Sequence, residues 1–164
     1  MDQLRTHIPL VSAISPTNAG GVPAEWVIAP GADPSRRLLY IHGGGFVAGS
    51  PTSHRIITSK LSEITNSAVL AVDYRLSPEH KREACIEDCR SAYDWLLVNG
   101  PKEESTASAV YVAGDSAGGN LTLSLLAWTR DTQRRAANAA VALSPVTDMR
   151  MVNPSIKALS LIHI

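Results

Sequence analysis

VYVAGDSAGGN, residues 110–120, joins a buried-strand pattern to a very tight turn. The stretch begins with apolar and β-branched residues, which is typical of a buried strand, and breaks at Gly114. A single serine, Ser116, comes next between an aspartate and an alanine, and a helix-forming run begins directly behind it. The pattern G-x-S-x-G between a strand and a helix is typical of a turn that lifts a nucleophilic serine above the edge of a sheet.

The two glycines that flank this serine, Gly114 and Gly118, have a steric reason. In so tight a turn, a side chain at either position is expected to collide with the neighbouring strand or helix. The helix behind Ser116 also offers free backbone N–H groups and the positive end of its dipole to an anion. We therefore predict that Ser116 is the nucleophile of an acyl-transfer reaction.

Four buried-strand patterns follow one another along the chain, separated by amphipathic segments. The strand patterns are LLYIH (38–42), SAVLAVDY (67–74), SAVYVAGD (108–115) and NAAVALSP (138–145). This alternation predicts an α/β fold with a mainly parallel sheet and helices on both faces. Before Leu38, short apolar runs around residues 8–14 and 26–29 predict a pair of hairpin-like edge strands.

Three segments between the strands have helical periodicity. The expected inward faces are Ile57, Leu61 and Ile64 in residues 53–65; Cys85, Cys89, Ala92 and Leu96 in residues 83–99; and Leu121, Leu125 and Trp128 in residues 116–130. Ser53 is the expected N-cap of the first helix, and Asn99-Gly100-Pro101 is expected to end the second. The two cysteines have no further ligands at suitable spacing, so we expect reduced core cysteines and no metal site.

The HGGG motif that begins at His42 follows the first of the four strands. Because the carboxyl ends of parallel strands gather at one edge of a sheet, this loop and Ser116 are expected to meet there. Glycine lets backbone N–H groups approach the alkoxide of a tetrahedral intermediate. We predict an oxyanion hole made by the N–H groups of Gly43, Gly44 and Ala117. His42 is expected to hold the loop through a backbone hydrogen bond, and not to act as the general base.

Composition limits the partners of the chain. Its 164 residues contain 15 basic and 15 acidic side chains, so no basic excess points to a nucleic acid. The amino-terminal residues lack the basic and apolar regions of a signal peptide, and no apolar window is long enough to span a membrane. A cytoplasmic location is therefore expected, with a small molecule as the partner and a homodimer as a possible assembly.

Three segments together resemble, in order and spacing, the hormone-sensitive-lipase family of α/β-hydrolases: YIHGGGFVAGS (40–50), VDYRLSPEH (72–80) and VAGDSAGGNL (112–121). The resemblance implies an α/β-hydrolase fold and a serine carboxylesterase that acts on short- to medium-chain acyl esters. It implies an acyl-enzyme at Ser116 and no cofactor. It also implies that Asp73-Tyr74-Arg75 serves as a scaffold for the glycine loop.

The chain departs from the family pattern after the serine. A catalytic triad needs an acid and then a histidine downstream, and here only Asp131, Asp148 and His163 follow Ser116. The family places its acid and histidine after two further strands. We therefore expect residues 1–164 to form a single, partial α/β-hydrolase domain that lacks the C-terminal strands and a working triad. An unpaired sheet edge with an aggregation hazard is also expected.

A second departure lies before the second helix, where Lys81-Arg82-Glu83 replaces the Pro-rich apolar turn of the family. We expect a solvated turn there.

Two other interpretations remain at this point. The chain could be a binding protein on the same scaffold, like the plant hormone receptors that resemble this family and keep the serine and glycine loop without the histidine. It could also be another α/β protein in which both motifs are structural. No phosphate-binding G-x-x-x-x-G-K-[ST] loop and no early G-x-G-x-x-G fingerprint supports that last interpretation.

Overall fold

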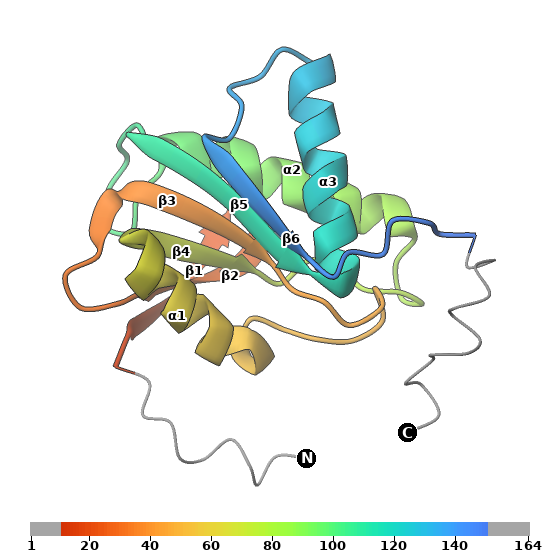
Figure 1. Ribbon diagram of the computed structural model, residues 1–164, viewed down its shortest axis with the longest axis horizontal. Helices are drawn as coiled ribbons and strands as arrows, with labels where there is room; N and C mark the ends of the chain where they lie inside the picture. Colours follow the sequence, from red (N-terminus) through yellow and green to blue (C-terminus); the bar gives the residue numbers. More distant parts are fainter. Residues whose placement is uncertain (1–10, 151–164) are drawn as a thin grey trace, which may run out of the picture.

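The computed structural model describes residues 11–150 of the chain. In chain order the elements are β1 (Ala13–Ala19), β2 (Val22–Ile28), β3 (Asp33–Ile41), a short 3₁₀ helix η2 (Thr52–His54), α1 (Arg55–Thr65), β4 (Ser67–Val72), α2 (Arg82–Val98), β5 (Ala109–Asp115), α3 (Ser116–Asp131) and β6 (Ala139–Leu143). Figure 1 shows these elements wrapped around one twisted sheet.

The described strands form one sheet in the order β1-β2-β4-β3-β5-β6. Strands β4, β3, β5 and β6 run parallel to one another, while β2 is antiparallel to β4 and to β1. The predicted mainly parallel sheet is therefore confirmed.

The predicted amino-terminal hairpin is also present, with a turn at Gly20-Gly21 where both residues have positive φ angles of 66° and 96°. Its first strand begins at Ala13, later than the pattern around residues 8–14 predicts. Residues 8–10 lie outside the described part. The strand runs through Pro16, because β1 is an edge strand and tolerates a missing ladder donor.

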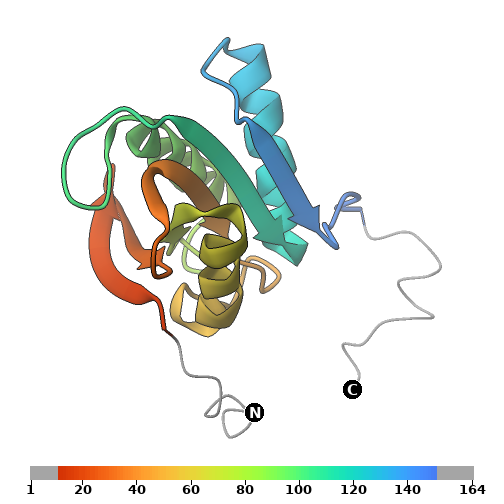
Figure 2. The same cartoon turned by 60° about the vertical axis from the view of Figure 1, so that its left-hand side comes forward.

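Helices cover both faces of the sheet, as predicted. Helix α1 packs on β2 and β4 from one side, and α2 and α3 pack on the other side (Figure 2). Strand β3 supplies both cores in alternation: Leu39 and Ile41 face α2 and α3, whereas Leu38 and Tyr40 face the side of α1. A strand buried on both faces has a continuous run of apolar residues, as residues 38–41 do.

The predicted inward faces of α2 and α3 are buried, and Trp128 is half-buried against them. In α1 the prediction is partly wrong, because Ile57 and Leu61 pack on the sheet but Ile64 is 65% exposed. Near the end of α1 the buried contact is made by Ser62. Its hydroxyl donates to the Ser67 carbonyl at 2.7 Å and accepts from the Ala29 N–H at 2.8 Å.

The predicted cap of α1 is also wrong. Ser53 lies within η2, and the residue before α1 is His54, whose side chain makes no capping hydrogen bond. Because η2 leads straight into α1, the chain turns into the helix before the predicted cap position is free to act.

Strand β6 lies at the edge of the sheet and pairs only with β5 among the described residues. Its apolar side chains Val141 and Leu143 are 52% and 37% exposed. The predicted exposed edge is therefore present in the described part of the chain, although β6 has the sequence of a buried strand.

Candidate active site

Ser116 sits at the turn where β5 ends and α3 begins, with a left-handed backbone φ of 52°. The two flanking glycines make the turn possible. A Cβ atom on Gly118 would overlap the carbonyl oxygen of Ile41 in the adjacent strand, and one on Gly114 would overlap the carbonyl of Gly118. The collisions predicted for these two positions are confirmed.

The segment after β6 fastens the first turn of α3 from the other side. The N–H of Val146 donates to the Ser116 carbonyl at 3.2 Å, and the Asn120 side chain donates to the Val146 carbonyl at 2.6 Å. A Cβ atom on Gly119 would lie 3.0 Å from a side-chain carbon of Pro145. The start of α3 is thus held between β3 and this segment.

The glycine loop meets the elbow directly at the carboxyl ends of the strands. Its first glycine, Gly43, is buried, and its N–H donates to Oδ1 of Asp115 at 2.9 Å. A Cβ atom on Gly43 would overlap the Asp115 carboxylate. The two motifs lie 72 residues apart in the chain and are in contact in the fold, as expected for strand ends at one edge.

This contact changes the expected set of oxyanion donors. The Gly43 N–H was predicted to face the substrate, but it is occupied by Asp115. Gly44 and Gly45 are exposed, with φ angles of 121° and 65°, and their N–H groups make no hydrogen bond within residues 11–150. Ala117, buried beneath the turn, is the second residue of α3, where a backbone N–H has no intrahelical partner.

The carboxylate of Asp115 gathers three groups around it. Tyr40 donates its hydroxyl to Oδ1 at 2.7 Å, Gly43 donates its N–H to the same oxygen, and Nε2 of His54 lies 3.6 Å from it. Burial by itself would raise the pKa of Asp115, but the His54 and Tyr40 hydrogen bonds, the charge of His54 and the Gly43 N–H together lower it to about 2. The carboxylate is therefore ionised at neutral pH.

Sequence reasoning missed Tyr40 and His54, which belong to the strand and the 3₁₀ helix that flank the glycine loop. The pKa of Tyr40 is raised by burial and by the neighbouring Asp115. Tyr40 lies two residues before HGGG and His54 lies nine residues after it, and only the folded sheet shows that both reach the same carboxylate.

His42 supports the glycine loop as predicted. It is buried, its Nδ1 lies 2.7 Å from the Gly43 carbonyl oxygen, and burial lowers its pKa. Since a carbonyl oxygen only accepts, Nδ1 carries the proton. The ring of Tyr74 stacks on His42 at 4.3 Å, and the Tyr74 hydroxyl donates to the His42 carbonyl at 2.8 Å. This geometry supports the scaffold role expected for residues 73–75.

Two arginines tie α2 to this region. Arg75 donates its backbone N–H and its guanidinium to Asp88 on α2, at 2.7–3.0 Å. Arg82, expected in a solvated turn, is instead the first residue of α2 and donates to the Asn120 side chain at 2.8 Å. Its guanidinium also lies over the Phe46 ring, 5.0 Å from the centroid. That expectation is wrong for Arg82, because the turn packs against the glycine loop.

The acids that follow Ser116 have other partners. Asp131 pairs with Arg130 at 2.8 Å, and Asp148 binds Arg150 through both carboxylate oxygens at 2.9 Å. The Ser116 hydroxyl makes no hydrogen bond with another residue of the described part, and His163 lies outside it. No group of three or more His, Cys, Asp or Glu side chains among residues 11–150 could hold a metal ion.

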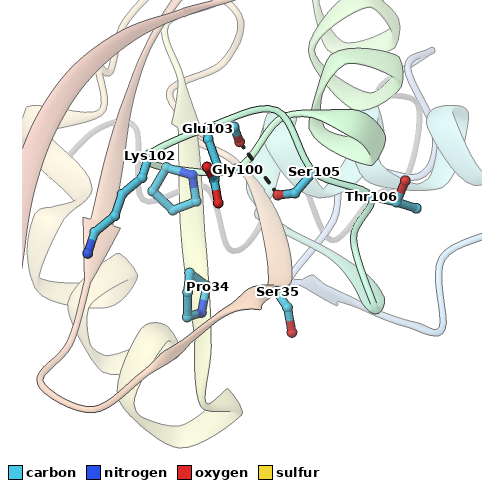
Figure 3. Close-up of a pocket in the computed structure, with 8 residues that line it drawn as sticks. Pro34, Ser35, Gly100, Lys102, Glu103, Ser105 and Thr106 are labelled. Carbon is cyan, nitrogen blue, oxygen red and sulfur yellow. Dashed lines mark hydrogen bonds between the residues drawn. The ribbon is translucent and has the colours of Figure 1, made fainter.

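A hollow of about 250 Å³ opens at the amino ends of β3 and β5, opposite the strand ends that carry Ser116 (Figure 3). It is lined by Pro34 and Ser35 at the start of β3 and by six residues of the segment that leads into β5: Gly100, Pro101, Lys102, Glu103, Ser105 and Thr106. Because these are the amino ends of the strands, the hollow is separate from the edge that carries Ser116.

Comparison with known proteins gives one match to a family of the α/β hydrolase fold, over residues 38–162. Among curated proteins, an acetyl-hydrolase of Streptomyces hygroscopicus is 42% identical over 130 residues, which are 79% of this chain and 42% of that protein. The carboxylesterase/phospholipase LipF of Mycobacterium tuberculosis is 41% identical over 136 residues, covering 80% of this chain and 35% of LipF.

Solved structures give the same answer. An esterase of the bacterial hormone-sensitive lipase family superposes with a TM-score of 0.81 and 37% identity, over 92% of this chain and 50% of that one. The hormone-sensitive-lipase homologue EstE7, from a metagenome library, has a TM-score of 0.83 and 33% identity, over 95% and 52%. The chain thus spans about half the length of these relatives or less. No helix in the described part is long and apolar enough to cross a membrane.

Proposed function

Since this chain belongs to the α/β-hydrolase family, in its hormone-sensitive-lipase group, we propose that it carries the nucleophile and oxyanion hole of a serine carboxylesterase. The observation that carries the proposal is the juxtaposition at the carboxyl edge of the sheet. Ser116 stands at a left-handed turn, and in the glycine loop beside it the N–H groups of Gly44 and Gly45 donate no hydrogen bond within residues 11–150. The substrate is a carboxylic ester with a short- to medium-length acyl chain.

In the proposed reaction, Oγ of Ser116 attacks the ester carbonyl carbon and passes its proton to a general base. The carbonyl oxygen becomes an alkoxide, and collapse of the tetrahedral intermediate expels the alcohol, which takes up a proton. An acyl-enzyme at Ser116 remains. Attack of water on this acyl-enzyme releases the carboxylic acid and restores the serine.

The alkoxide is stabilised by backbone N–H groups. We assign Gly44, Gly45 and Ala117 to this role, with Gly45 taking the place predicted for Gly43, because the Gly43 N–H is already bound to Asp115. The positive end of α3 adds to the stabilisation. Loss of one such donor typically lowers kcat by about 100- to 1000-fold.

The general base of the reaction is not among the hydrogen-bond partners of Ser116 in residues 11–150. No described histidine is hydrogen-bonded to Ser116, and a serine without a base is a weak nucleophile at neutral pH. The family resemblance places the acid and the histidine after two further strands. Sequencing the coding DNA around this chain tests whether an acid and a histidine are encoded at those positions.

The names of the relatives support the substrate class. They include an acetyl-hydrolase and a carboxylesterase/phospholipase, and both names denote cleavage of acyl esters. The cytoplasmic location and the homodimer remain predictions from the sequence.

A covalent probe tests the proposed nucleophile. The chain, and any longer chain that its coding DNA specifies, is treated with a fluorophosphonate, and the modified peptide is identified by mass spectrometry. The expected result is one adduct at Ser116 that is lost in Ser116→Ala and kept in Ser124→Ala, a control serine on the same helix. An adduct elsewhere, or none in the longest chain, contradicts the assignment.

A further inference from the structure

We propose that Asp115 is a positioning residue whose carboxylate fixes the glycine loop against the nucleophile elbow. The proposal rests on the function proposed above, because it concerns how the oxyanion donors of that site are held. It assigns Asp115 no contact with the substrate.

Hydrogen bonds connect Asp115 to β3 and to the glycine loop. Asp115 is the residue before Ser116, so its backbone is part of the same turn. Its Oδ1 receives both the Gly43 N–H, at 2.9 Å, and the Tyr40 hydroxyl, at 2.7 Å. One carboxylate oxygen thus joins the last strand residues before Ser116 to the end of β3, where the glycine loop begins.

The side chain of Asp115 does not cap the helix that it precedes. It occupies the N-cap position of α3, where an aspartate side chain usually accepts an N–H of the first helical turn. Here the side chain makes no capping hydrogen bond and binds the glycine loop instead. The first-turn N–H groups of α3, including that of Ala117, are therefore left for a ligand.

Gly43 lies in close contact with the Asp115 carboxylate. A Cβ atom there would overlap the carboxylate of Asp115, so the loop approaches this closely only because residue 43 is glycine. The exposed Gly44 and Gly45 follow immediately, and their N–H groups donate no hydrogen bond within the described residues. The anchored Gly43 is then the nearest fixed point for the two free donors.

Tyr40, His42, His54 and Tyr74 are titratable groups near Asp115 among residues 11–150. His54 Nε2 lies 3.6 Å from Oδ1, and the Tyr40 hydroxyl binds that oxygen. The ring of His42 lies 5.5 Å from that of His54. The Tyr40 hydroxyl and the Gly43 N–H both donate to Oδ1, and these hydrogen bonds favour the ionised carboxylate.

Amide hydrogen exchange, followed by NMR, tests the anchoring without any turnover. Asp115→Ala removes the acceptor of the Gly43 N–H, whereas Asp115→Asn keeps an oxygen there and removes the charge. We expect Gly43 to exchange at least 30-fold faster in Asp115→Ala and about three- to tenfold faster in Asp115→Asn. Asp94→Ala, which removes an exposed carboxylate on α2, is the matched control and should leave the Gly43 exchange rate unchanged.

Kinetics on a chain with Ser116-dependent turnover tests the consequence. In Asp115→Ala we expect kcat to fall about 100-fold with KM changed less than threefold, and Asp115→Asn should restore at least tenfold of the lost kcat. A purely structural role would lower the midpoint of thermal unfolding and leave kcat of the folded enzyme unchanged, which would overturn the proposal.

Exchange of Gly43 at the wild-type rate in Asp115→Ala would also overturn it. If Asp115→Ala does not fold, wild-type exchange in Asp115→Asn has the same meaning. Turnover that does not depend on Ser116 would refute the proposed function, while the exchange comparison would still decide the role of Asp115.

Discussion

Gly118 shows how little room surrounds the proposed nucleophile. Its missing side chain is what lets α3 begin against the carbonyl oxygen of Ile41 at the end of β3. Gly114 is constrained by the Gly118 carbonyl across the turn. Gly43 and Asp115 constrain each other, although they lie 72 residues apart in the chain. At the scale of single residues, the site is defined by close backbone approach.

Gly118→Ala tests this constraint. Alanine favours a helix over glycine by about 1 kcal/mol, yet here its Cβ atom has no space. We expect the free energy of unfolding to fall by about 1–3 kcal/mol, as measured by urea denaturation. Ser124→Ala on the same helix should change it by less than about 0.5 kcal/mol. Equal stability of Gly118→Ala and the wild type would contradict the packing described here.

The pH dependence of stability tests the charge of Asp115. Burial opposes ionisation, but the His54 and Tyr40 hydrogen bonds lower the folded-state pKa from its ordinary value of 3.8 to about 2. A lowered pKa stabilises the fold above the unfolded-state pKa, and this contribution is lost as the pH falls from about 4 to about 2.

We therefore expect wild type to be more stable than Asp115→Asn at pH 6, with a gap that narrows below about pH 4. Chemical denaturation at a series of pH values measures it. A gap that stays constant down to pH 2 would mean that Asp115 has an ordinary pKa in the folded chain.

At this scale the sequence predicted the elbow and the need for its glycines, because both follow from local geometry. It did not predict that the Gly43 N–H is occupied. The acceptor, Asp115, lies 72 residues further along the chain, and nothing in either motif shows that its carboxylate turns away from the helix that it precedes.

At the scale of elements, α1 shows that the helical spacing of apolar residues does not by itself predict which of them are buried. The spacing of Ile57, Leu61 and Ile64 predicts one apolar face, yet the end of the helix contacts the sheet through Ser62 and leaves Ile64 in solvent. Ser62 donates to the Ser67 carbonyl of β4 and accepts from the N–H of Ala29, the residue after β2. These two hydrogen bonds bring the end of α1 closer to the sheet than an isoleucine side chain at that contact would allow. Sequence periodicity alone cannot show such a partner. Helices α2 and α3, without it, were predicted correctly.

Ile57→Ala and Ile64→Ala form a matched pair on α1. We expect Ile57→Ala to lower the free energy of unfolding by about 1–3 kcal/mol, because Ile57 packs on the sheet. Ile64→Ala should change it by less than about 0.5 kcal/mol. Equal losses in urea denaturation of the two variants would show that α1 is rotated relative to the arrangement described here.

At the scale of the whole molecule, the parallel core places HGGG and GDSAG at one edge, as strand order predicts. The same order puts β6 at the side of the sheet, where its apolar residues are exposed. Its composition resembles that of a central strand, so its exposure could not be derived from the pattern of β6 itself. It was expected only from the resemblance to a longer family.

Exposed edge strands pair readily with other chains. We expect the 164-residue chain to self-associate at micromolar concentration, and Val141→Lys to shift it toward the monomer in light scattering. Ile64→Lys adds the same charge on α1 and is the control, with no such shift expected. Equal behaviour of the two variants would place the association surface elsewhere.

The assignment of Ser116 as the nucleophile of an esterase can be tested on the enzyme itself. Its most direct test is hydrolysis of a short activated ester by the longest chain that the coding DNA specifies, beside Ser116→Ala and the 164-residue chain. We expect turnover that disappears in Ser116→Ala and is weak or absent in the 164-residue chain, where no described histidine is hydrogen-bonded to the serine. Equal turnover with and without Ser116, or tight binding of a small carboxylate with no turnover at all, would contradict it.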